Sequence, residues 1–172
     1  ANVAPINTVP GAQTATVNTP LGLGGISVAD ANGDLASTQL SVSQGTLTVT
    51  LSGGATLSSG ANGSSSLTIS GTQADINATL ASLVYQGNLN YTGADTLTVL
   101  STDSQGASDS DAVNITVTAA NVAPINTVPG AQTATVNTPL GLGGISVADA
   151  NGDLASTQLS VSQGTLTVTL SG

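Results

Sequence analysis

"DTLTVLS" (residues 95–101) and "DAVNITVT" (residues 111–118) decide the fold of this chain, because both alternate apolar and polar residues. In the second stretch Val113, Ile115 and Val117 occupy every other position, with Asn or Thr between them. Successive side chains of a β-strand point to opposite faces, so the alternation is typical of strands with one buried face and one face in water. The two stretches therefore predict strands of an all-β protein.

Two further stretches, "GTLTVTL" (residues 45–51) and "SLTIS" (residues 66–70), show the same alternation. Their polar positions hold Thr and Ser, and Thr favours strands because its branched side chain fits a pleated surface. Glycine-containing turns separate the strands, at Gly24-Gly25, Asn32-Gly33, Gly53-Gly54, Asn62-Gly63 and Gly93. Several short strands with frequent turns predict a two-sheet β-sandwich.

One segment, "SGTQADINATLASLVYQG" (residues 70–87), departs from this alternation. Ile76, Leu80 and Leu83 recur at spacings of three or four residues, which is typical of one face of an α-helix. The motif "TQAD" near its start resembles a capping box, in which Glu or Gln is more usual than Asp. The sequence therefore predicts one short helix, at roughly residues 73–82, that crosses between two late strands.

The chain contains a long repeat, since residues 1–53 and 120–172 are identical letter for letter. A unit of this length has the size of an independently folding domain, whereas solenoid repeats have about 20–50 residues. The sequence predicts a complete β-sandwich repeat at residues 1–119 and the first part of an identical second repeat at residues 120–172. The identity fits either a natural array or a designed consensus tandem repeat.

The second copy has no counterpart of residues 54–119, which hold the predicted helix and the last two strands. Alone, residues 120–172 would expose strand edges and half a core, which natural proteins avoid. If they are ordered, we expect them to pair with the late strands of a neighbouring chain, or with residues 54–119 of the same chain in a permuted domain. In the permuted case residues 1–53 would need an outside partner, and head-to-tail repetition would build a filament.

The composition argues against several classes of function. The 172-residue chain has no Lys, Arg, His or Cys, and its nine acidic residues give a net charge of −9. Proteins neutralise phosphate backbones with Lys or Arg, so nucleic acid and anionic membrane surfaces are not expected partners. No apolar run reaches the roughly 20 residues that span a bilayer. Nucleophilic catalysis needs a base such as His or Lys, so we do not expect an enzyme.

Three long stretches carry a family resemblance: residues 2–35 ("NVAPINTVPG…NGDL"), residues 66–99 ("SLTISGTQAD…TLTV") and residues 101–124 ("STDSQGASDS…NVAP"). In this order they resemble the cadherin-like, immunoglobulin-like tandem repeats of giant bacterial surface proteins, the RTX-type adhesins and related extracellular fibres. The resemblance covers the whole chain. It implies an immunoglobulin/cadherin-like β-sandwich in a secreted or cell-surface protein, which acts as a spacer or stalk. A domain that binds glycan or protein through its loops is the alternative.

The same family often holds calcium at the junctions between its domains, and this chain has a fitting motif. "VADANGDLAST" (residues 28–38) returns at residues 147–157 and places oxygen-bearing side chains at alternate positions. These are Asp30, Asn32 and Asp34 in the first copy, and Asp149, Asn151 and Asp153 in the second. Calcium takes about six to eight oxygen ligands, of which such a motif supplies a part. The other interpretation is a plain hairpin turn, because Asn-Gly is a strong turn signal.

A second loop could complete the calcium site. In an immunoglobulin-type sandwich the loop after the second strand and the final hairpin loop lie at the same end as the N-terminus. The final loop, "TDSQGASDSD" (residues 102–111), adds Asp103, Asp109 and Asp111. Up to five carboxylates could then converge beside the incoming linker, where they would repel one another unless a cation bridged them. Of the predicted ligands, Asp30 and Asp34 come foremost. The full set is Asp30, Asn32, Asp34, Asp103, Asp109 and Asp111 in the first copy, and Asp149, Asn151 and Asp153 in the second.

Overall fold

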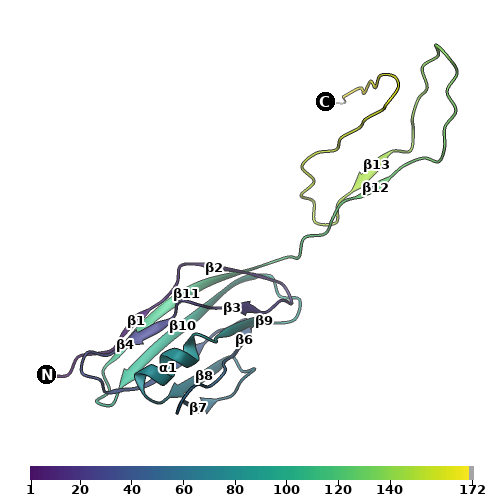
Figure 1. The fold of residues 1–172 in the computed structure, drawn as a ribbon. Coiled ribbons are helices and arrows are strands. Elements are labelled where there is room, and N and C mark those ends of the chain that lie inside the picture. Colours follow the sequence, from purple (N-terminus) through teal and green to yellow (C-terminus); the bar gives the residue numbers. More distant parts are fainter. Residues whose placement is uncertain (171–172) are drawn as a thin grey trace. The chain divides into compact units, whose positions relative to one another are not determined.

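The computed structural model describes residues 1–170, and the chain divides into two units between Ala120 and Asn121 (Figure 1). Unit 1 is residues 1–120, and unit 2 is residues 121–170. Most regular structure is β, and the described residues contain a single helix. That helix is short, and none of the described helical structure has the length and apolar character needed to cross a membrane.

Unit 1 is built on a sheet of six strands. In spatial order these are β2 (Gln13–Thr16), β11 (Ser108–Thr118), β10 (Gly93–Asp103), β5 (Leu35–Ser41), β8 (Ser66–Ser70) and β7 (Thr56–Gly60). The predicted strands at 95–101 and 111–118 form the long central hairpin β10–β11, which pairs Leu97 with Val113. All neighbouring strands are antiparallel except β2, which runs parallel to β11.

Two smaller sheets and the helix complete unit 1 (Figure 1). The first sheet pairs β1 (Ile6–Thr8) with β4 (Ser27–Ala29), and the second has the order β3 (Leu21–Gly22), β9 (Val84–Gly87), β6 (Gly45–Thr48). The helix is α1 (Gln73–Leu80). It begins where the sequence predicts and ends two residues earlier, because the N–H groups of Ser82 and Leu83 bond carbonyls three residues back, and not four as in an α-helix.

The α1 helix begins at a side-chain cap. The Thr72 hydroxyl oxygen accepts the N–H of Asp75 at 3.2 Å, and the hydroxyl donates to the Asp75 carboxylate at 2.8 Å. Such a cap satisfies one of the free N–H groups of the first turn. Ile76 and Leu80 lie on the buried face of the helix with no exposed surface. The predicted helix between late strands is therefore confirmed, and its apolar spacing reflects burial.

One cluster of buried side chains joins the sheets and the helix. It includes Leu97 and Val99 of β10, Ile76 of α1, Leu47 of β6 and Tyr85 of β9, each with 0% of its surface exposed. Burial of this apolar surface is the dominant favourable term in folding. The all-β fold with layered sheets is confirmed at this level, and the core is aliphatic apart from Tyr85.

The two ends of unit 1 lie at opposite ends of the long strand β11. The Asn2 side chain donates to Asp103 at 2.8 Å, beside the turn that precedes β11. The strand then runs 11 residues, roughly 35 Å, to Thr118. There the carbonyl of Thr118 accepts the N–H of Val17 at 2.8 Å. The chain therefore enters unit 1 at one end and leaves it at the other (Figure 1).

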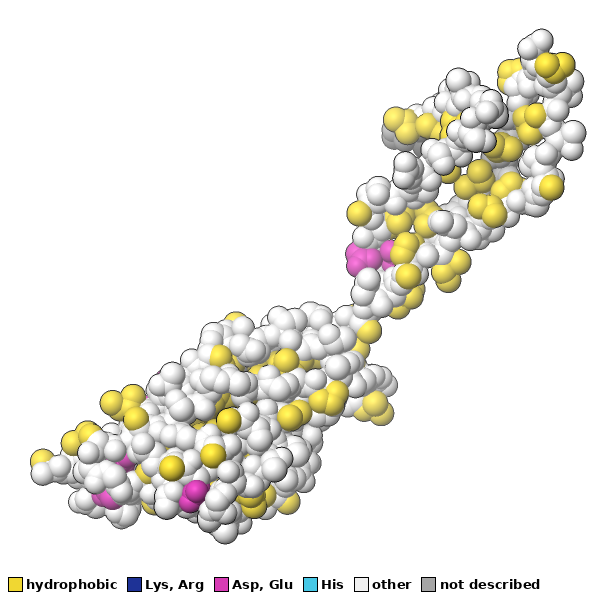
Figure 2. Space-filling view, viewed as in Figure 1, with side chains coloured by type: hydrophobic (Ala, Val, Ile, Leu, Met, Phe, Trp, Pro, Cys, Tyr) yellow, Lys and Arg dark blue, Asp and Glu magenta, His cyan; other side chains and the backbone are white. Residues whose placement is uncertain are grey.

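Residues 1–53 supply the early strands that pair with residues 54–119. Unit 2 repeats the first local pairing of the fold, since β12 (Ile125–Thr127) pairs with β13 (Ser146–Ala148) as β1 pairs with β4. No other strand forms in the part of unit 2 that the structure describes. Hydrophobic side chains are exposed along this unit (Figure 2).

Candidate metal centre

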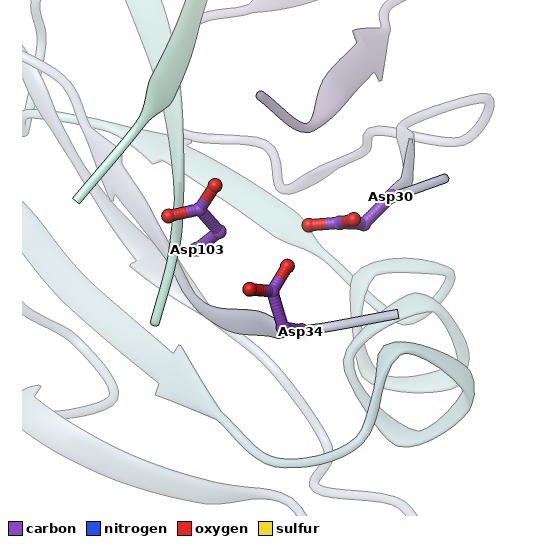
Figure 3. Close-up of side chains that lie close together, drawn as sticks. All are labelled: Asp30, Asp34 and Asp103. Atoms are coloured by element: carbon purple, nitrogen blue, oxygen red, sulfur yellow. The ribbon is translucent and has the colours of Figure 1, made fainter. Parts of the chain in front are cut away.

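Three aspartates from separate elements meet at the N-terminal end of unit 1 (Figure 3). Asp30 directly follows β4, Asp34 directly precedes β5, and Asp103 is the last residue of β10. Each contributes one carboxylate oxygen to a group in which all three oxygens lie within 4.8 Å of one another. The predicted site residues Asp30, Asp34 and Asp103 are thus brought together by the ends of three strands.

The Asp30 carboxylate is buried, and only one of its two oxygens accepts hydrogen bonds. It is 9% exposed, and its Oδ1 accepts the N–H groups of Asn32 at 3.0 Å and Gly33 at 3.1 Å. This is the aspartate turn that the Asn-Gly motif predicts, and Gly33 adopts the φ of +73° that the turn needs. Asp30 Oδ2 is buried and has no hydrogen-bond donor among residues 1–170. An unpaired buried oxygen is unfavourable, and a bound cation would remove that cost.

Asp103 is held ionised by its hydrogen bonds. The side chain is 3% exposed, and burial by itself raises the pKa of its carboxyl. Oδ2 accepts the Asn2 amide at 2.8 Å, and Oδ1 accepts the N–H groups of Gln105 and Ala107, both at 2.9 Å. These donors outweigh burial and keep the pKa of Asp103 below its ordinary value. The site therefore carries this negative charge at neutral pH.

Amide side chains connect Asp34 to the incoming chain. The Asn32 amide donates to Asp34 Oδ1 at 2.6 Å and to Asn2 Oδ1 at 3.0 Å. The Gln105 amide donates to Asp34 Oδ2 at 2.9 Å and to Asn2 Oδ1 at 3.1 Å. The N–H of Val3 donates to Asn32 Oδ1 at 3.2 Å. The residues that enter unit 1 are therefore tied directly to the carboxylate group.

The donor set fits a hard divalent cation. It offers carboxylate oxygens from Asp30, Asp34 and Asp103, and the side-chain amides of Asn2 and Asn32 face Asp103 and Asp34 with their nitrogen atoms. Oxygen atoms of this kind are the ligands that calcium takes in proteins. The sequence has no Lys, Arg or His to balance the three carboxylates. Together with the unpaired Oδ2 of Asp30, this makes the three carboxylates the residues that would hold the ion.

Two predicted ligands lie elsewhere, so the expected convergence of five carboxylates is wrong. Strand β11 begins at Ser108, which places Asp109 and Asp111 along the strand and not in the loop. Asp109 Oδ2 accepts the N–H of Asn7 at 2.8 Å and so fastens β1 to the sheet. Asp111 pairs in register with Val99 of β10. Strand pairing therefore fixes the positions of both residues, and the loop motif in the sequence does not reveal that pairing.

The second copy reproduces the turn without the third carboxylate. Asp149 Oδ1 accepts the N–H groups of Asn151 at 3.1 Å and Gly152 at 3.2 Å, as Asp30 does in unit 1. The Asn151 amide donates to Asn121 at 2.8 Å, which repeats the contact of Asn32 with Asn2. Within the described chain, Asp149 and Asp153 belong to no group of three possible metal ligands. The turn and its contact with the linker are therefore local features.

The sequence reasoning missed a buried carboxylate, Asp95, and the linker amide Asn2. Asp95 is 5% exposed and accepts the N–H groups of Ser43 at 3.0 Å and Gln44 at 2.9 Å, and the Tyr85 hydroxyl at 3.0 Å. Burial, and then the bond to Asp95, raise the pKa of Tyr85 well above its ordinary value. The alternation of β10 could have revealed the burial of Asp95, because Asp95 lies two residues before the buried Leu97 and so on the same face of the strand.

The lowered pKa of Asp103 predicts a specific acid sensitivity. A carboxyl whose pKa is lower in the folded state stabilises the fold above about pH 4, where it is ionised in both states. That stability is lost as the pH falls through the folded pKa. We expect thermal unfolding of the chain, followed by circular dichroism from pH 7 to 2, to show a smaller acid decline in Asp103→Asn than in the wild type. Asp153→Asn, which alters an exposed carboxylate, serves as the control; equal declines in Asp103→Asn and wild type would contradict the assignment.

The comparisons with known proteins place this site inside a known domain. No curated protein matches the sequence. A hypothetical protein from Saccharophagus degradans, described as nucleoside hydrolase-related and associated with carbohydrate metabolism, is similar in structure at 17% identity and a TM-score of 0.34. That similarity covers 69% of this chain and 26% of the other, so this chain spans about a quarter of that protein. The family of the Protein GAMETE EXPRESSED 2 domain matches residues 25–112, which include Asp30, Asp34 and Asp103. Because the match covers just over half of the sequence, the chain belongs to the GAMETE EXPRESSED 2 domain family.

Proposed function

We propose that residues 1–119 are a structural, non-catalytic repeat of an extracellular fibre or long bacterial surface adhesin, and that the repeat acts as a spacer or stalk. The observation that carries this proposal is the path of the chain through unit 1. The chain enters beside Asp103 and leaves at Thr118, about 35 Å away along β11. Copies joined end to end would therefore each add length in one direction.

The repeat itself supports the same proposal. Residues 120–172 repeat residues 1–53 without a single change, so a second module begins directly where the first one ends. A spacer needs many equivalent modules, whereas a dedicated binding tip needs one distinctive surface. We interpret unit 1 as an immunoglobulin/cadherin-like sandwich on the resemblance of its sequence to bacterial surface repeats. Its six-stranded sheet and layered core are compatible with that interpretation.

A divalent cation, for which we propose calcium, would act at the junction between modules. When bound, it would neutralise the carboxylates of Asp30, Asp34 and Asp103. The chain's own residues make the mechanical connection: Asn2 of the incoming segment bonds Asp103, and Val3 bonds Asn32. Holding the three carboxylates together would therefore fix the direction in which the preceding segment leaves. The expected effect is a stiffer array.

Arrays of two, three and four copies of residues 1–119 test this function by small-angle X-ray scattering. We expect the maximum dimension to grow by about 4 nm per copy in calcium, since β11 alone spans about 3.5 nm. A chelator should leave each module folded but shorten the average array, because the linkers then bend. Asp34→Asn should give the shortened array even in calcium, and Asp111→Asn should not, because Asp111 lies outside the carboxylate group.

Two results would count against the proposal. A maximum dimension that fails to increase with the number of copies would exclude the spacer function. If the maximum dimension responds to calcium equally in Asp34→Asn and Asp111→Asn, the spacer function would stand but the proposed cation site would be excluded. Calorimetric titration of the same variants with calcium separates binding at the site from non-specific screening, which acts on all exposed carboxylates.

A further inference from the structure

Strands β2 and β11 of unit 1 pair in parallel, although they are distant in the sequence. Their register sets Gln13 beside Ile115 and Thr16 beside Thr118. Along the chain, β2 is the first strand of the six-stranded sheet and β11 is the last. Both strands therefore run side by side from the end where the chain enters unit 1 toward the end where it leaves (Figure 1).

Tension along unit 1 would act on this contact in a defined direction. A pull on the chain before Asn2 draws β2 toward the entry end, and a pull on the chain after Thr118 draws β11 toward the exit end. The two strands are thus pulled past each other along their length. Hydrogen bonds of a parallel pair are evenly spaced along the strands, so this sliding strains all of them together. A pull at right angles to the strands would break them one after another, at a lower force.

Two hydrogen bonds strengthen the exit end of the pair. The N–H of Val17 donates to the carbonyl of Thr118 at 2.8 Å, and the Thr118 hydroxyl donates to the carbonyl of Ala15 at 3.2 Å. Ala15 and Val117, which pair in register there, are 2% and 3% exposed. Hydrogen bonds beside such a buried face are electrostatically stronger than hydrogen bonds in water. The contact between β2 and β11 therefore extends beyond the backbone ladder.

A second contact, between Asn7 and Asp109, fastens the chain nearer the entry end. The N–H of Asn7 donates to Asp109 Oδ2 at 2.8 Å, and the Asn7 amide donates to the carbonyls of Asp109 at 3.0 Å and Val99 at 3.2 Å. The Ser101 hydroxyl donates to Asn7 Oδ1 at 2.6 Å. A hydrogen bond to a carboxylate is roughly twice as strong as one between neutral groups. Because Asn7 precedes β2 in the chain, tension from the N-terminal side reaches this contact before it reaches β2.

We propose that unit 1 carries tension along its length, and that the parallel contact of β2 with β11, together with the Asn7–Asp109 contact, sets the force at which it unfolds. The proposal rests on the spacer function for the source of the tension, since a fibre is pulled at its two ends. It assigns a role to Asp109, which lies outside the carboxylate group of Asp30, Asp34 and Asp103. None of the contacts involves a cation.

Single-molecule force spectroscopy of the full chain tests this proposal through the direction of the pull. The sequence has no cysteine, so Ala1→Cys with Ala120→Cys provides two unique attachment points at opposite ends of unit 1, and the pull slides β2 along β11. Thr19→Cys with Ala120→Cys attaches the handles just beyond the same ends of β2 and β11, so the pull peels the strands apart. We expect the peeling force to be about two- to threefold lower than the sliding force.

Matched variants separate resistance to force from thermodynamic stability. Asp109→Ala should lower the sliding force by about a third and leave the peeling force unchanged, because peeling reaches Asn7 only after β2 has separated. Ile69→Val, a core substitution in β8 on the other side of the sheet, should lower the urea midpoint and leave both forces almost unchanged. All measurements are made in a chelator, so that the proposed cation site has no influence on them.

Two outcomes would overturn the proposal. Equal forces in the two pulling directions would show that the parallel pair does not resist tension, and this comparison needs no destabilising substitution. A sliding force that falls with Ile69→Val as much as with Asp109→Ala would show that overall stability sets the force. Either outcome would leave the spacer function intact if the scattering arrays still lengthen with each copy, so the two proposals fail independently.

Discussion

Leu40→Ala is expected to lower the free energy of unfolding of unit 1 by about 2–5 kcal/mol, whereas Leu159→Ala should change it by less than about 0.5 kcal/mol. The two leucines stand in identical sequence surroundings. Leu40 has 0% of its surface exposed, so its removal leaves a cavity among close-packed neighbours, whereas Leu159 is 48% exposed. Urea unfolding of the full chain, followed by circular dichroism, measures both variants under the same conditions.

The paired design makes this result easy to contradict. If the local sequence around the leucine decided its effect, the two substitutions would lower the free energy of unfolding equally. A unit 2 folded like unit 1 would do the same and would add a second unfolding transition in the wild type. Only the difference in burial predicts that the first variant is strongly destabilised and the second is not.

Asp95→Ala is expected to destabilise unit 1 by about 2–4 kcal/mol, although Asp95 takes part in no cation site. The substitution leaves the N–H groups of Ser43 and Gln44 without their acceptor, and it leaves the Tyr85 hydroxyl with only its longer bond, of 3.3 Å, to the carbonyl of Gln44. Buried donors without acceptors cost more than a hydrogen bond gains, since they lose water as well. The same urea titration measures the effect.

Two control variants define the source of that loss. Tyr85→Phe removes one donor but leaves the Asp95 carboxylate bonded to the two backbone N–H groups, so we expect a loss of about 1 kcal/mol. Asp153→Ala removes an exposed carboxylate and should be nearly neutral. Equal effects of Asp95→Ala and Asp153→Ala would show that net charge, and not the buried network, decides stability.

Strand and helix positions could be predicted from the sequence because burial follows local periodicity. The alternation in residues 111–118 predicted the C-terminal part of β11, and the spacing of Ile76 and Leu80 predicted α1. Strand order could not be predicted in this way. The parallel contact of β2 with β11 joins residues about a hundred positions apart, and no local pattern specifies it.

The candidate site was predictable in part for the same reason. The turn around Asp30 and Asp34 forms from adjacent residues, and its copy around Asp149 forms as well. The presence of Asp103 in the carboxylate group, and the hydrogen bond of Asp109 to Asn7, depend on which strands lie side by side. These are tertiary facts, because they join segments distant in the sequence.

The identical stretches 1–53 and 120–172 separate the two kinds of information within one chain. By itself the sequence determined the features that recur in both: the pairing of β1 with β4 and of β12 with β13, and the aspartate turn with its linker contact. These involve contacts within the repeated segment. Only the tertiary structure decided which copy becomes a core, because burial requires a second apolar surface. Residues 54–119 provide that surface to residues 1–53, and the counterparts of the leucines buried there stay exposed in unit 2.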